Sequence, residues 1–146
     1  MTARKVLLAA LAAGTLVACA QEPPTSAANG MPGPGAVPVV QTYKSPSCGC
    51  CDLWVEHRQA AGFEVQVTNT AELDRIRRRA GVPPGHGSCH TAEVSGYFIE
   101  GHVPADDVRR LLAERPEARG LMVPGMVLGS PGMEQGTLRQ PFEVLL

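Results

Sequence analysis

The sequence has 146 residues, with 13 basic and 14 acidic side chains, so its formal net charge at pH 7 is −1. Nucleic-acid binding needs a basic face, which a weakly acidic chain lacks, so we expect no nucleic-acid partner. The basic run formed by Arg75, Arg77, Arg78 and Arg79 is typical of the solvated face of a helix.

The first 18 residues have the layout of a signal peptide. Two basic residues precede an apolar run over residues 6–13, which is shorter than the roughly 20 residues that cross a bilayer. The ending Leu-Val-Ala-Cys at residues 16–19 resembles the lipobox of bacterial lipoproteins. We therefore predict that Cys19 becomes a lipidated first residue in the cell envelope, on the periplasmic side, and at the outer membrane if the host is Gram-negative. Ordinary cleavage that leaves the Cys19 thiol free is the alternative.

Residues 19–37 are rich in proline and glycine and show no hydrophobic period. This composition predicts a flexible tether, whose average reach is roughly 20–25 Å for a chain of this kind. The remaining residues, 38–146, suit one compact domain. We therefore expect a signal peptide, a tether and one folded domain.

Within residues 38–146, short apolar runs alternate with stretches of helical period, which predicts an α/β fold around a small mixed sheet flanked by helices. Residues 37–43 and 63–67 predict the first two strands. A helix is expected between them, over residues 50–61. The side chains on its buried side would be Leu53, Trp54, His57 and Ala61.

A second helix is expected to begin at a capping box formed by Asn69 and Glu72 and to end at Gly81. Residues 91–94 and 97–99, which are joined by Ser95 and Gly96, predict an antiparallel hairpin.

Pro104 begins a third predicted helix, which ends near Pro116. Beyond residue 119 we expect a loop, followed by a last strand over residues 142–146. The order of the first seven elements, strand, helix, strand, helix, strand, strand and helix, resembles that of the thioredoxin-like fold.

Three cysteines lie within four residues, at the junction of the first strand and the first helix. Cys48 and Cys51 have the C-x-x-C spacing of a redox dithiol, and the amides at the start of a helix favour thiolate. Cys50 adds a third sulfur, which either complicates a disulfide or supplies another metal ligand. Cys89 precedes the third predicted strand, in a connection that resembles the loop facing the dithiol of thioredoxin-like chains. We expect the four sulfurs to meet.

The cysteines alone do not choose the metal, because thiolates favour copper(I), zinc and iron–sulfur clusters. Structural zinc sites commonly use separated pairs of cysteines, whereas crowded thiolates that can bridge suit copper(I), as one ion or several. Two structural disulfides are another alternative for an envelope protein. They would need at least one long bridge, because Cys50 and Cys51 are neighbours and would strain a mutual bond.

Histidines and methionines are weaker candidates. His102 either caps the third helix or approaches the metal, and Met126 offers a soft thioether, although methionine more often fills packing gaps. His57 follows Cys50 by two helical turns on one face of the helix. His90 should point away from the sulfur site if the third strand has already begun.

Four segments together resemble the envelope proteins called domain of unknown function 411, which include CopG-like copper-resistance proteins. These segments are residues 44–57, 88–92, 96–105 and 120–133, and the similarity covers residues 38–146. The resemblance implies a thioredoxin-like domain that binds copper through Cys48, Cys50, Cys51 and Cys89, with thiol redox chemistry at Cys48 and Cys51.

The function that we expect is copper(I) binding for detoxification or transfer. Its partners would be copper ions and other envelope proteins that handle copper. Two alternatives remain open on the sequence: an enzyme that acts as a thiol–disulfide oxidoreductase, and a structural zinc module.

Overall fold

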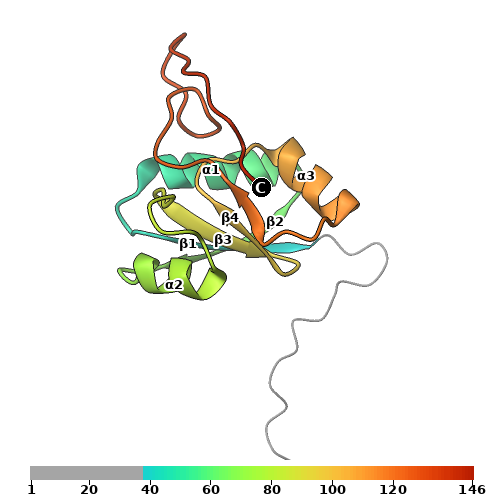
Figure 1. The fold of residues 1–146 in the computed structure, drawn as a ribbon. Helices are drawn as coiled ribbons and strands as arrows, with labels where there is room; N and C mark the ends of the chain where they lie inside the picture. Colours follow the sequence, from blue (N-terminus) through green and yellow to red (C-terminus); the bar gives the residue numbers. More distant parts are fainter. Residues whose placement is uncertain (1–37) are drawn as a thin grey trace, which may run out of the picture.

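The computed structural model describes residues 38–146, so the predicted signal peptide, the tether and Cys19 lie outside the described residues. Five strands form one mixed sheet that three helices cover (Figure 1), which confirms the predicted α/β class. The elements in chain order are β1 (Val39–Lys44), α1 (Gly49–Ala60), β2 (Glu64–Asn69), α2 (Leu73–Ala80), β3 (His90–Val94), β4 (Tyr97–Glu100), α3 (Ala105–Glu114) and β5 (Gly120–Met122).

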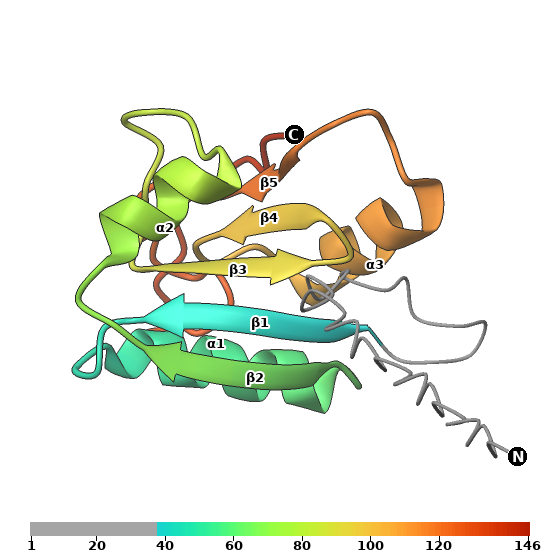
Figure 2. The same ribbon diagram turned by 90° about the horizontal axis from the view of Figure 1, so that it is seen from below.

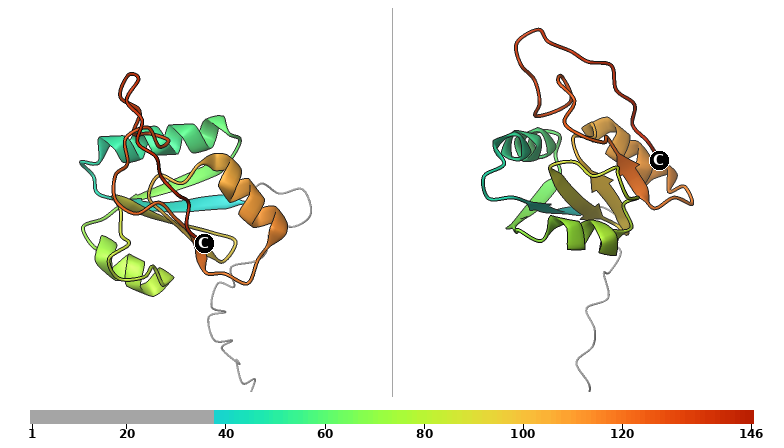
Figure 3. Two further views of the ribbon diagram at one scale, coloured as in Figure 1. Left: turned by 45° about the horizontal axis from the view of Figure 1, so that its top comes forward. Right: turned by 60° about the vertical axis from the view of Figure 1, so that its left-hand side comes forward.

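The strands lie in the order β2-β1-β3-β4-β5 (Figure 2). The two outer pairs, β2 with β1 and β4 with β5, are parallel, whereas the two inner pairs are antiparallel. Parallel neighbours need a crossover connection, and α1 and α3 supply the two crossovers. Both helices lie on one face of the sheet, and α2 covers the other face (Figure 3). No helix within residues 38–146 is long and apolar enough to cross a membrane.

The main core lies between the sheet and the layer of α1 and α3. Its central side chains include Val40, Trp54, Ile99, Val103 and Val108, all at most 1% exposed. Burying each of them stabilises the fold by about 1.5–3 kcal/mol relative to an exposed side chain. This core fixes where α1 lies on the sheet, and therefore where the cysteines at its start are placed.

The predicted buried side of α1 is right for Trp54 and wrong for Leu53 and His57. The buried residues of the helix are Cys51, Trp54, Val55 and Arg58, which follow the i, i+3, i+4, i+7 spacing of one helical face. Leu53 is 50% exposed and His57 is half-buried. The face differs because Arg58 is buried, with its Cζ 4.4 Å from the centroid of the Trp54 ring, and a sequence pattern assigns an arginine to the surface.

The predicted capping box at Asn69 and Glu72 is also wrong. β2 continues to Asn69, which pairs with Lys44 of β1. Glu72 is the N-cap of α2 and makes no capping bond with its side chain, while its backbone N–H donates to Thr70 Oγ1 at 2.9 Å. The short turn after the strand therefore begins the helix.

The hairpin between β3 and β4 is confirmed as antiparallel. Its turn residues Ser95 and Gly96 have positive φ angles of 48° and 90°, as the two-residue turn that matches the strand twist requires.

The last part of the chain differs from the prediction at two places. The expected loop begins with β5, where a Cβ on Gly120 would overlap the Phe98 backbone, so a glycine permits the close pairing with β4. A glycine in the sequence usually indicates a loop, which is why a loop and not a strand was expected at Gly120. The strand expected over residues 142–146 is a single bridge between Leu145 and Met122.

Candidate metal centre

The cysteine segment begins α1 directly after β1. Cys48 is the N-cap of the helix, and its N–H donates to the Ser45 carbonyl oxygen at 3.1 Å. Lys44, which is buried at the end of β1, forms an ion pair with Asp52 of the first helical turn, with 2.9 Å between Nζ and Oδ1. This pair joins the strand end to the helix start on both sides of the cysteines.

The structure brings the four predicted cysteines together. The ligand atoms of Cys48, Cys50, Cys51 and Cys89 all lie within 4.8 Å of one another. Cys89 can reach α1 because β3 runs antiparallel to β1, with His90 paired with Lys44. The residue before β3 and the residues after β1 therefore lie at the same end of these two neighbouring strands.

Cys48 and Cys51 form a disulfide with a Cα–Cα distance of 5.4 Å, whereas Cys50 and Cys89 are free. The Sγ atom of Cys50 lies 3.5 Å from that of Cys48 and 3.8 Å from that of Cys89. The C-x-x-C pair is thus in its oxidised form, beside two thiols. The alternative of two structural disulfides does not describe this arrangement, in which residues 38–146 contain one short bridge.

His102 faces the same sulfur cluster. Its Nε2 lies 2.9 Å from Cys89 Sγ, and its Nδ1 lies 2.8 Å from the Pro131 carbonyl oxygen. Since a carbonyl only accepts, Nδ1–H is the donor, and the Nε2 lone pair is directed to the sulfur. Metal-ligating histidines have this arrangement. The cap of α3 is Pro104, without a side-chain bond, so of the two roles open to His102, capping is not the one observed.

His90 also borders the cluster, because Cys89 lies outside β3 and the condition under which His90 was expected to point away is not met. β3 begins at His90 itself, which directs the ring to the α1 face, with its centroid 4.3 Å from that of Trp54. From there Nδ1 lies 3.4 Å from Cys89 Sγ. The ligand atoms of Cys89, His90 and His102 form a second group within 4.8 Å. A one-residue difference in the strand start decides this contact, and the sequence carries no signal for it.

Burial controls protonation at this site. It lowers the pKa of His102 and, more strongly, that of His90, so both rings are neutral at pH 7 and offer a lone pair. Burial and the neighbouring Cys50 raise the pKa of the Cys89 thiol to about 12. A soft cation at the cluster would therefore replace the Cys89 proton, as metal binding to thiols requires.

The remaining candidates lie outside the two groups of ligand atoms. Met126 is 61% exposed, on a segment whose Gly125 N–H donates to the Gly87 carbonyl oxygen near the Cys89 loop. Met122 packs in a small apolar cluster with Val82 and Phe98. Among the residues described, Met126 is thus a peripheral thioether and Met122 is a packing residue.

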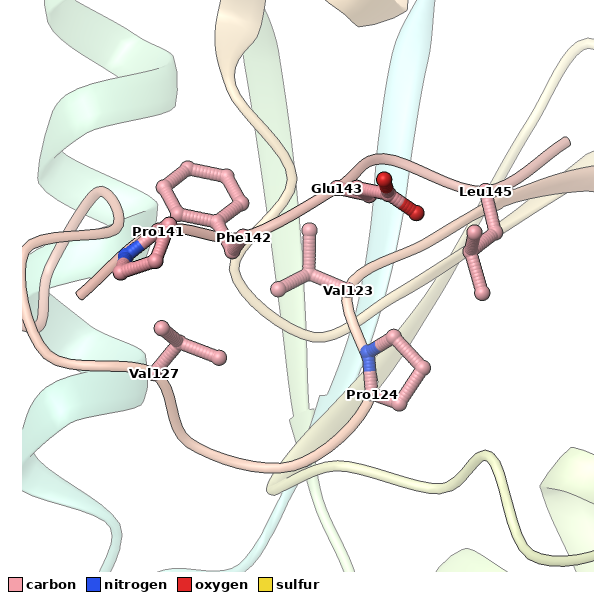
Figure 4. A pocket seen from close by; sticks show the side chains of 7 residues that line it. All are labelled: Val123, Pro124, Val127, Pro141, Phe142, Glu143 and Leu145. Carbon is pink, nitrogen blue, oxygen red and sulfur yellow. The ribbon is translucent and has the colours of Figure 1, made fainter.

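A cavity of about 440 Å³, which is open to solvent and lined by apolar residues and Glu143, lies on the C-terminal segment (Figure 4). None of the site cysteines or histidines contributes to its wall. The lining residues are Val123, Pro124, Val127, Pro141, Phe142, Glu143 and Leu145. The cavity therefore does not coincide with the sulfur cluster.

The fold is mixed α/β, and four cysteine sulfurs and two neutral imidazoles gather at one end of its central strands. These features define a cysteine-rich, metal-binding class of protein. Residues 86–133 match the family model described as "Protein of unknown function, DUF411". This match includes Cys89 and His102, and the cysteines of α1 lie before it.

Two solved structures are similar to the chain over most of its length. "Copper resistance protein copG", Form 2, is 41% identical with a TM-score of 0.72, and covers 75% of this chain and 87% of its own. Form 1 is 42% identical with a TM-score of 0.70, and the shares are 73% and 84%. The chain therefore belongs to the DUF411 family of copper-resistance proteins. No curated protein matches it.

Proposed function

We propose that this protein binds copper(I) in the cell envelope, for detoxification or transfer, through Cys48, Cys50, Cys51 and Cys89. The observation that carries the proposal is the convergence of four sulfurs within 4.8 Å. Thiolates are soft ligands that select copper(I) over hard cations. The two similar structures are named copper resistance proteins, which favours copper over zinc.

His102 is the additional nitrogen ligand of this proposal, because its Nε2 already faces Cys89 at 2.9 Å. Close sulfurs can bridge metal ions, and we propose that the site takes one copper ion or several. Met126 is exposed, and we assign it at most an outer role. Met126→Ala should leave the copper stoichiometry unchanged.

Copper binding by all four sulfurs is coupled to thiol redox chemistry. The disulfide occupies Cys48 and Cys51, and a thiol reductant that supplies two electrons and two protons converts it into two thiols. We propose that the reduced protein offers four thiolates to copper(I), and the oxidised protein only two. In this proposal the fold is thioredoxin-like, with a dithiol at the start of α1 and Cys89 in the facing loop.

We infer the location from the sequence of residues 1–37. A signal peptide over residues 1–18 and lipidation of Cys19 would anchor the domain in the envelope, with residues 19–37 as its tether. Metabolic labelling with palmitate tests the anchor. Label should be incorporated into the full chain and lost in Cys19→Ala, and equal labelling of both would contradict lipidation at this residue.

The experiment that tests copper binding is a titration of the reduced protein with copper(I), followed by native mass spectrometry. Tight uptake should fall sharply in Cys50→Ser and Cys89→Ser, because each change removes one sulfur from the cluster. Ser47→Ala is the matched control, since Ser47 is an exposed residue of the same turn. Unchanged uptake in both cysteine variants would refute the site.

The disulfide favours a second candidate function, a thiol–disulfide oxidoreductase. Cys48 is half-buried and Cys51 is fully buried, so Cys48 is the sulfur that a protein substrate can reach. This function predicts metal-free reduction of insulin that disappears in Cys48→Ser and survives in Cys50→Ser. Copper binding without turnover predicts no such reduction in the wild-type protein.

A further inference from the structure

A buried carboxylate holds Ser88, the residue that precedes Cys89. Glu100, at the end of β4, is fully buried. Its Oε1 accepts from the Ser88 N–H at 2.6 Å, and its Oε2 accepts from the Thr91 hydroxyl, also at 2.6 Å. The carboxylate therefore fixes backbone and side chain on both sides of Cys89.

Arg77 of α2 completes this arrangement. Its Nε donates to Glu100 Oε1 at 2.8 Å, and its Nη2 donates to the Ser88 carbonyl oxygen. Gly87 leaves the space for this arginine, because a Cβ there would lie 3.2 Å from Arg77 Nε. The N–H and the C=O of Ser88 are thus both held by one ion pair, which joins α2 to β4.

We infer that Glu100 and Arg77 are positioning residues, which act through the Ser88 peptide to hold the Cys89 thiol opposite α1. This inference deepens the proposed function, since a copper(I) site of four sulfurs needs the Cys89 thiol close to that of Cys50, which lies 3.8 Å away in the structure. Bonds beyond the direct ligands commonly set metal affinity by orienting those ligands. A fork of two N–H donors is a property of arginine that lysine lacks.

A second ion pair between α2 and the sheet serves as the control for a purely structural role; its side chains are 57% and 35% exposed, against 17% and 0% for Arg77 and Glu100. Arg79 of the same helix pairs with Glu93 of β3, with 3.2 Å between Nη2 and Oε1. This second pair also ties α2 to the sheet. The bonds of its carboxylate are to Arg79 and not to the Ser88 peptide. A change that only loosens α2 should therefore appear in variants of both pairs, whereas a change in Cys89 position should appear only in variants of the first.

The test measures, in the absence of copper, how fast a reagent bridges the two free thiols, which depends on how close they are held. Phenylarsine oxide bridges two close thiols through two As–S bonds, and its oxygen leaves as water with the two thiol protons. The full chain with Cys19→Ser is used, with the Cys48–Cys51 disulfide intact, so that Cys50 and Cys89 are the reacting pair. Formation of the bridged species is followed by mass spectrometry under non-denaturing conditions.

Glu100→Gln should slow bridging about tenfold or more, because bridging depends on how closely the two thiols are held together. Arg77→Lys, which keeps the charge and loses the fork, should act in the same direction, and it decides the test if Glu100→Gln does not fold. Glu93→Gln should bridge at the wild-type rate. Wild-type bridging in every folded variant of the first pair, or equal slowing in Glu93→Gln, would overturn the inference.

The copper affinity of the same variants separates this inference from the proposed function. If both hold, Glu100→Gln weakens copper(I) binding by about 10- to 100-fold, and Glu93→Gln leaves it unchanged. Slowed bridging together with unaltered copper binding would support the positioning role and count against Cys89 as a copper ligand. Unaltered bridging would defeat the positioning role alone, because Cys89→Ser still tests the ligand.

Discussion

Replacing Gly132 by alanine is expected to destabilise the metal-free protein and to disturb the copper site. Gly132 has a φ of +82°, and a Cβ there would lie 2.7 Å from Trp54 N and 2.9 Å from Cys50 O. Both are backbone atoms of α1, which cannot swing aside as the end of a side chain can. The loop at Gly132 would therefore have to move away from the helix.

The magnitude has two parts. A positive φ costs an L-residue about 1–2 kcal/mol. The nearest contact is also about 0.7 Å shorter than the 3.4 Å of ordinary van der Waals contact, and overpacking of this kind costs about 1–3 kcal/mol more. Gly85→Ala is the matched control, because Gly85 has the same φ of +82° and open space at its Cβ position. We expect it to lose only about 1–2 kcal/mol.

Urea unfolding of the metal-free variants measures both free energies of unfolding. A copper(I) competition assay gives a second readout, because Pro131 next to Gly132 accepts the bond from His102 Nδ1. Displacing the loop should move His102 and weaken copper binding about tenfold, while Gly85→Ala should not. Equal loss of stability in the two variants would refute the claim that the loop is packed tightly against the start of α1.

Two further predictions concern protonation and the buried arginine. Because the pKa of Cys89 is raised to about 12, its thiol is protonated at neutral pH and copper(I) must displace that proton. The apparent affinity for copper(I) should therefore rise about tenfold per pH unit for each proton released. A copper(I) affinity that does not change between about pH 6 and 8 in a competition assay would contradict this. Burial disfavours the Cys89 thiolate in the folded protein, which raises the thiol pKa from its ordinary value of 9.0 to about 12. Urea unfolding of the metal-free protein should therefore show stability falling as pH rises from 9.0 toward 12. Arg58 is buried, and its Nη2 donates to the Val103 carbonyl oxygen, whereas Nε and Nη1 have no partner within residues 38–146. Arg58→Met should therefore keep or raise the free energy of unfolding, whereas Arg58→Ala should lose about 2–4 kcal/mol of packing on Trp54. Equal losses in both variants would show that the guanidinium itself stabilises the fold.

Local sequence patterns predicted most of the elements but misjudged those that depend on tertiary contacts. The hairpin at Ser95 and Gly96 is encoded by its own two residues, so it could be predicted. β5 is three residues long and begins at Gly120, where close approach to Phe98 gives a glycine its role. The buried face of α1 was misassigned because Arg58 packs on Trp54, which is a contact that the helical period does not contain.

The candidate site divides in the same way. The crowded cysteines and the position of Cys89 before a strand predicted that four sulfurs meet, and their ligand atoms lie within 4.8 Å in the structure; their role as copper ligands stays a prediction. The contact of His90 with the sulfur cluster was not predicted, because the direction of its side chain depends on where β3 begins. Glu100 and Arg77 were not singled out, although a glutamate directly after Tyr-Phe-Ile in an apolar strand was a signal for a buried, paired carboxylate.

X-ray absorption at the copper edge of the reduced, copper(I)-loaded protein tests most directly whether the sulfur cluster holds the metal. We predict a first shell dominated by sulfur, and fewer sulfur neighbours per copper in Cys89→Ser, because that variant removes the sulfur that the loop before β3 supplies opposite α1. A first shell of nitrogen and oxygen, or a sulfur shell that is the same in wild type and Cys89→Ser, would contradict the account.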